Sequence, residues 1–161
     1  MLKKTILMAD DDRDFLKIGE LFLQRAGFKV VTAQDGYHAL HLALTADPSL
    51  MLLDINMPAG SGWSVNERIR ANAPTSGLPI VYITGERGEA VRAEAARMGA
   101  AALLYKPLEY DVLLTTIKAI LNDLEMCKPK LTALPKEDSH DLWPNFGGEF
   151  AMKAGVAAAS R

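Results

Sequence analysis

Short apolar runs alternate with longer amphipathic segments along residues 1–124. The apolar runs are rich in Val, Ile or Leu and bounded by Asp, Gly or Pro, which predicts strands over residues 5–9, 29–33, 50–53, 78–84 and 101–105. The intervening segments carry apolar residues at helical spacing, which predicts helices over residues 14–25, 36–45, 64–71, 89–98 and 110–125. Strict alternation of this kind indicates a parallel sheet with helices on both faces.

The organisation of the chain changes after residue 124. The runs at 5–9, 50–53 and 78–84 are apolar nearly throughout, as in strands that are covered on both faces. Because strands and helices alternate up to residue 124, we expect residues 1–124 to form one domain. Residues 125–161 are interrupted by Pro and Gly and show weak periodicity. This segment is too short to bury a core, and we expect a C-terminal tail that is neither a separate domain nor a DNA-binding unit.

Composition and charge exclude several classes of protein. The chain has 18 Lys and Arg against 20 Asp and Glu, so it lacks the basic excess of most nucleic-acid-binding proteins. It contains no apolar run of the roughly 18–20 residues that span a bilayer, and Asp10 to Asp12 end the N-terminal apolar stretch too early for a signal peptide. With Cys127 as its single cysteine, we expect a cytoplasmic protein with no nucleic-acid or membrane partner.

Carboxylates stand where two of the predicted strands end. Asp10 and Asp11 follow the first strand, and Asp54 follows the third. The carboxyl ends of parallel strands form the ligand crevice of such sheets, so these acids converge if the two strands are neighbours. Crowded carboxylates raise one another's pKa or require a cation, and Mg²⁺ suits a few carboxylates with a backbone carbonyl and water.

Two further polar residues stand where the fourth and fifth predicted strands end. Thr84 ends the fourth strand and Lys106 follows the fifth. A hydroxyl and an ammonium beside acidic metal ligands stabilise a phosphoryl group, and an Asp carboxylate is a nucleophile that forms an acyl phosphate. Each residue alone is more often a cap, a strand former or a solvated side chain. Their coincidence at four strand ends favours the functional interpretation.

The segments that carry these residues, 8–12, 53–58, 83–85 and 105–107, match in order and spacing the motifs of one family. The chain resembles the receiver domain of two-component response regulators over residues 3–124. The resemblance implies a flavodoxin-like α/β fold: a doubly wound, five-stranded parallel sheet of order 2-1-3-4-5 with five helices. It also implies a cis peptide bond between Lys106 and Pro107.

The resemblance assigns a role to each matching residue in the acidic half of the site. Asp54 is then the phosphoacceptor, and Asp10 and Asp11 are the acidic metal pair. Mg²⁺ is the implied cofactor, with Asp54 and the main-chain carbonyl of Asn56 as further ligands.

The same resemblance covers the rest of the site and its partners. Thr84 is the implied switch hydroxyl, and Lys106 is the residue that pairs with the phosphoryl group. Asn56 and Glu86 are the implied residues that tune the hydrolysis of the phosphorylated Asp54. A histidine kinase or histidine phosphotransfer protein is the implied donor. The output is a contact with an unknown protein or an onward relay, and the chain is not an enzyme beyond its own phosphorylation and dephosphorylation.

The sequence departs from the family at two positions. Leu103 stands where the family often has Tyr or Phe, with Tyr105 two residues on as a substitute, and Ser61 stands where Asp is common.

The sequence leaves two alternative functions. The first is a haloacid-dehalogenase-like phosphatase, which needs an Asp as general acid two residues after its nucleophile, where this chain has Asn56. A degenerate receiver that acts only as a scaffold is the other alternative.

Overall fold

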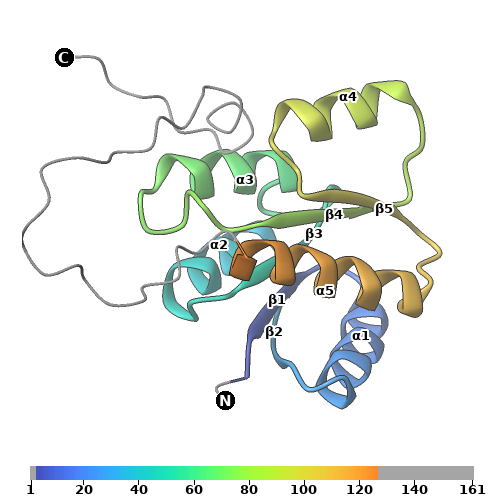
Figure 1. Cartoon of the computed structure of the whole chain (residues 1–161). Helices are drawn as coiled ribbons and strands as arrows, with labels where there is room; N and C mark the ends of the chain where they lie inside the picture. The colour runs from blue at the N-terminus through green and yellow to red at the C-terminus, as the bar shows by residue number, and fades with distance from the viewer. Residues whose placement is uncertain (1–2, 127–161) are drawn as a thin grey trace, which may run out of the picture.

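Strands and helices alternate along the computed structural model, which describes residues 3–126 (Figure 1). The strands are β1 (Thr5–Ala9), β2 (Lys29–Ala33), β3 (Leu50–Asp54), β4 (Ile80–Thr84) and β5 (Ala102–Tyr105). The helices are α1 (Arg13–Arg25), α2 (Gly36–Thr45), α3 (Gly62–Ala71), α4 (Glu89–Arg97) and α5 (Tyr110–Met126). The predicted elements are confirmed, with ends that shift by one or two residues.

The five strands form one parallel sheet in the order β2-β1-β3-β4-β5, which is the order that the resemblance implied. β1 and β3 are therefore neighbours although an entire strand and two helices separate them in the chain. Met8 pairs with Leu52 and Ala9 with Leu53. This register brings the residues that follow β1 to the same edge of the sheet as the end of β3.

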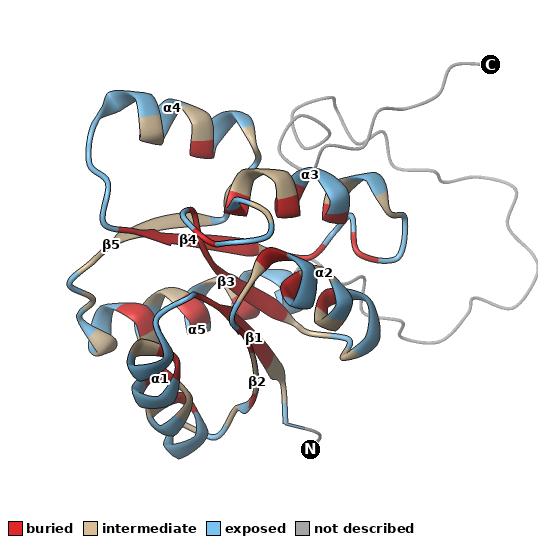
Figure 2. Cartoon of the chain, turned by 180° about the vertical axis from the view of Figure 1, so that it is seen from behind, coloured by how far each residue is buried: buried red, intermediate tan, exposed pale blue. Residues whose placement is uncertain are grey.

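Helices cover both faces of the sheet, and each face has its own hydrophobic cluster (Figure 2). On one face α2, α3 and α4 pack against alternate strand residues such as Leu7, Leu53 and Tyr82. On the other face α1 and α5 pack against Ile6 and Leu52. Every residue of β3 and β4 is buried, as their continuous apolar sequences predicted.

Capping side chains explain why two helices begin earlier than predicted. α1 starts directly after Asp12, whose carboxylate accepts hydrogen bonds at 3.0 and 3.1 Å from two backbone N–H groups of the first turn. α3 starts at Gly62 because the Ser61 hydroxyl accepts from the Ser64 N–H at 3.3 Å. Asp12 is therefore a cap rather than a member of the acidic cluster that follows β1.

A turn explains why β4 begins two residues later than predicted. The Leu78 N–H donates to the Thr75 carbonyl at 3.0 Å, which closes a turn. Pro79 has no N–H to give to a neighbouring strand. The ladder therefore begins at Ile80.

A glycine allows α3 to begin directly against the end of β3. A Cβ atom at Gly62 would collide with the Asp54 carbonyl oxygen, and the Gly62 N–H donates to the Ile55 carbonyl at 2.8 Å. Only a residue without a side chain fits this approach. The backbone that carries Asp54 is thus fixed on its α3 side.

α5 continues to Met126, two residues beyond the predicted end of the domain. The remainder of the predicted tail, with Cys127, lies outside the described residues. Within residues 3–126, none of the helices combines the length and the apolar character needed to cross a bilayer.

Candidate functional site

Three carboxylates meet at the carboxyl edge of the sheet. Asp10 follows β1 directly, Asp54 is the last residue of β3, and one oxygen from each of Asp10, Asp11 and Asp54 lies within 4.8 Å of the others. Asp10 and Asp54 are 1% and 4% exposed, whereas Asp11 faces solvent. The structure therefore brings together the acids that the sequence selected, and it buries two of them.

Lys106 places its ammonium between the two buried acids. Its Nζ lies 2.6 Å from Asp10 Oδ2 and 3.4 Å from Asp54 Oδ1. The peptide bond that follows it, to Pro107, is cis, as the resemblance implied. The same Nζ lies 4.9 Å from the centre of the Phe15 ring, a contact that the sequence did not suggest.

Burial and like charge shape the protonation of the site. Desolvation, followed by the charge of Asp10, raises the pKa of Asp54 from 3.8 to about 6, although Lys106 and the Asn56 N–H act in the opposite direction. Burial lowers the pKa of Lys106, but its hydrogen bond to Asp10 and the two carboxylate charges outweigh burial and raise it above its ordinary value. Lys106 is thus held as a cation.

Backbone N–H groups orient the two buried carboxylates. The Asn56 N–H donates to Asp54 Oδ2 at 3.1 Å, and the Asp12 N–H donates to Asp10 Oδ1 at 2.9 Å. Both donors lie two residues after the carboxylate that they orient. These local bonds leave Asp54 Oδ1 facing Lys106.

Thr84, Asn56 and Glu86 line the loop side of the site. Thr84 is fully buried at the end of β4, and its Oγ1 accepts a hydrogen bond from the Glu86 N–H at 3.0 Å. The side chains of Asn56 and Glu86 are joined by an Nδ2–Oε1 hydrogen bond of 2.9 Å. The family resemblance groups these two residues, but the sequence does not predict that they bond across 30 positions of the chain.

The donor set fits a divalent cation. Its three carboxylates offer hard oxygen ligands, which Mg²⁺ prefers. Lys106 supplies one positive charge against these three acids, so the cluster retains negative charge when all of them are ionised. Asp10, Asp11 and Asp54 are the residues that would hold the ion.

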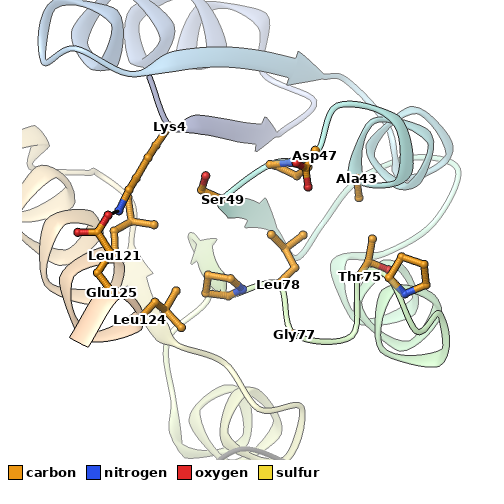
Figure 3. Close-up of a pocket in the computed structure, with 13 residues that line it drawn as sticks. Lys4, Ala43, Asp47, Ser49, Thr75, Gly77, Leu78, Leu121, Leu124 and Glu125 are labelled. Atoms are coloured by element: carbon orange, nitrogen blue, oxygen red, sulfur yellow. Dashed lines mark ion pairs between the residues drawn. The ribbon is translucent and has the colours of Figure 1, made fainter. Parts of the chain in front are cut away.

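A hollow of about 630 Å³ lies at the opposite edge of the sheet (Figure 3). Its wall includes the ion pair between Lys4 Nζ and Glu125 Oε1, which are 2.6 Å apart. Lys4 and Ser49 precede β1 and β3, so this hollow opens at the amino ends of the strands. It is separate from the acidic cluster and contains none of the predicted site residues.

Comparison with known proteins gives the family. The model of the response regulator receiver domain matches residues 6–118, and the chain belongs to this family. Protein PilH of Pseudomonas aeruginosa is 31% identical over 116 residues, which cover 72% of this chain and 96% of PilH. Transcriptional regulatory protein GltR of the same organism is 31% identical over 156 residues, which cover 92% of this chain.

Solved structures agree with this assignment. A CheY-like response regulator receiver domain protein from Methanospirillum hungatei JF-1 has a TM-score of 0.73 at 27% identity, covering 78% of this chain and 98% of that one. Chemotaxis response regulator CheY4 of Vibrio cholerae has a TM-score of 0.70 at 29% identity, covering 74% and 99%.

The matched region is only part of some relatives. The chain spans 64% of the length of GltR and 52% of the alkaline phosphatase synthesis transcriptional regulatory protein PhoP of Bacillus subtilis. Family membership therefore describes the receiver domain, and it does not carry over the activity of these longer proteins.

The raised pKa of Asp54 predicts a pH-dependent cost in stability. The folded protein holds this proton up to about pH 6 and the unfolded chain only up to 3.8, so the free energy of unfolding falls as the pH rises between these values. In metal-free buffer at about pH 7.5, Asp54→Asn is expected to be more stable than the wild type by about 1–3 kcal/mol.

Urea unfolding followed by far-UV circular dichroism measures this difference. The gap between wild type and Asp54→Asn should close as the pH falls below about 4, because both side chains are then neutral in both states. Asp47→Asn, at an exposed position, is the control. A gap that is constant from acidic to neutral pH contradicts the assigned cause.

Proposed function

We propose that this chain is a phosphorylation-dependent signalling module whose phosphoacceptor is Asp54. The observation that carries the proposal is the position of Asp54 Oδ1. Asp54 ends a buried strand and belongs to the cluster with Asp10 and Asp11, and its Oδ1 lies 3.4 Å from Lys106 Nζ. A buried carboxylate beside a cation and beside acids that can hold a metal ion is an arrangement suited to a nucleophile toward a phosphoryl group.

In the proposed transfer, Asp54 and each residue around it have a distinct chemical role. A carboxylate oxygen of Asp54 forms a bond to phosphorus while the phosphorus–nitrogen bond of a phosphohistidine breaks. Lys106 neutralises charge on the phosphoryl oxygens, and the Thr84 hydroxyl donates a hydrogen bond to one of them. Mg²⁺ held by Asp10, Asp11, Asp54 and the main-chain carbonyl of Asn56 would supply the remaining positive charge.

The donor in this proposal is a histidine kinase or a histidine phosphotransfer protein, and the output is a protein contact or an onward relay. The cytoplasm is the proposed location, without a nucleic-acid or membrane partner for the described domain. The phosphorylated state shifts a conformational equilibrium toward the form that binds the output partner. Apart from its own phosphorylation and dephosphorylation, the chain has no turnover reaction in this account.

The phosphatase alternative lacks its second acid. A turnover enzyme of the haloacid-dehalogenase type requires a proton donor at the position of Asn56. The Asn56 amide instead donates to Glu86 at 2.9 Å, and an amide does not release and recover a proton near neutral pH. We therefore set this alternative aside.

Phosphorylation at Asp54 is tested directly with a small donor. Incubation with acetyl phosphate and Mg²⁺ is expected to add one phosphoryl group per chain, because Asp54 Oδ1 lies 3.4 Å from Lys106 Nζ in the cluster with Asp10 and Asp11. Intact-mass spectrometry measures the adduct. Asp54→Asn should abolish it, whereas Asp47→Asn at the opposite edge of the sheet should retain it. An equal adduct on Asp54→Asn would contradict the assignment.

The lifetime of the phosphoryl group tests the roles of Asn56 and Glu86. Water must attack the phosphorus from the side opposite the Asp54 oxygen, and both residues are exposed, polar and of moderate size. We predict that the wild-type protein loses its phosphoryl group rapidly. Asn56→Arg should slow this loss by about tenfold or more, because the longer side chain obstructs the path of water.

Intact mass as a function of time, after removal of acetyl phosphate, gives the rate. His41→Arg adds the same side chain at an exposed position on α2 and should leave the rate unchanged. A wild-type adduct that persists for many hours, or equal rates in Asn56→Arg and wild type, contradicts rapid resetting.

A further inference from the structure

Tyr105, the last residue of β5, connects two separate parts of the chain. The guanidinium carbon of Arg87, in the loop between β4 and α4, lies 5.0 Å from the centre of its ring. The hydroxyl oxygen of Tyr105 accepts a hydrogen bond from Arg92 Nε, on α4, at 3.2 Å. One half-buried side chain therefore contacts both the loop and the helix that follows it.

Residues 85–88 form this loop, and they have few other attachments. All four are exposed, and Gly88, the N-cap residue before α4, provides no capping side chain for the helix. Glu86 donates from its N–H to Thr84 Oγ1 and accepts from Asn56 Nδ2, and the Gly88 carbonyl accepts from the Arg92 N–H at 3.3 Å. The contact between Arg87 and Tyr105 lies between these bonds along the chain.

The register of the sheet places this contact beside the candidate site. Tyr105 pairs with Thr84, so the residue that holds Arg87 is the cross-strand neighbour of the residue that holds Glu86. Leu103, the position where the family often has an aromatic residue, packs instead into the hydrophobic cluster on the α4 side of the sheet. Of these two β5 residues, Tyr105 is the one in contact with the loop.

We propose that Tyr105 is a positioning residue for Glu86. By holding Arg87 and Arg92, it keeps residues 85–88 in the orientation in which Glu86 accepts a hydrogen bond from Asn56, whose N–H in turn donates to Asp54. This proposal rests on the proposed function of Asp54, because the consequence is the lifetime of its phosphoryl group. A correctly held Glu86 orients the attacking water, and a loosely held Glu86 does so for a smaller fraction of the time.

The direct test is the rate of phosphoryl loss in Tyr105→Leu. This variant removes one cation–π contact and one hydrogen bond, so the lifetime is expected to increase by about three- to tenfold. Tyr105→Phe keeps the ring under Arg87 and should show a smaller increase. In a Glu86→Ala background, Tyr105→Leu should have no further effect, because the residue that it positions is gone.

A merely structural role for Tyr105 would lower stability without this dependence on Glu86. Tyr37→Leu, which removes an exposed tyrosine from α2, is the matched control and should leave the lifetime unchanged. An unchanged or shortened lifetime in Tyr105→Leu would overturn the proposal. The same factor with and without Glu86 would overturn it as well.

Hydrogen exchange provides a second measurement that needs no phosphorylation. The Glu86 N–H is bonded to Thr84 Oγ1, so a loosened loop should exchange this amide faster in Tyr105→Leu than in wild type or Tyr37→Leu. If the wild type takes up no phosphoryl group, the proposed function fails, while the exchange measurement still decides the role of Tyr105. Equal exchange in the three proteins overturns that role.

Discussion

Repulsion between two buried carboxylates is the constraint on which the rest of this structure depends. Asp10 and Asp54 leave adjacent strands at the same edge of the sheet, and both are almost completely shielded from solvent. Such a pair is unfavourable unless a cation or a proton intervenes. Lys106 provides one cation, 2.6 Å from Asp10 and 3.4 Å from Asp54, and burial, followed by the charge of Asp10, still raises the pKa of Asp54.

The surrounding elements keep that repulsion in place instead of relieving it. The pairing of β1 with β3 fixes the positions of the two strand ends. The backbone of Gly62 lies directly against the Asp54 carbonyl, so Asp54 has no room to move away from Asp10 toward α3. A divalent cation held by the cluster would complete the charge balance. Its binding energy would then be available to bias the loops that carry Asn56 and Glu86, which are linked to each other and to Thr84.

The sequence predicted buried parallel strands with polar groups at one edge, because its continuous apolar runs end in Asp or Thr, but the strand order came from the family resemblance alone. It also selected the acidic cluster and Lys106. It could not predict the contacts of Phe15 with Lys106 or of Asn56 with Glu86, because both depend on how loops from distant segments approach. The sequence suggested Tyr105 only as a substitute for Leu103, since its two arginine contacts come from the β4–α4 loop and from α4.

The most direct test of this account is the titration of the metal-free protein with Mg²⁺ by isothermal calorimetry. We predict that one ion binds per chain. Asp11→Ala, which removes the exposed member of the cluster, should weaken binding by about tenfold or more, while Asp123→Ala on the exposed face of α5 should not change it. Undiminished affinity in Asp11→Ala, or no binding by the wild type, would contradict the claim that the acidic cluster is a cation site.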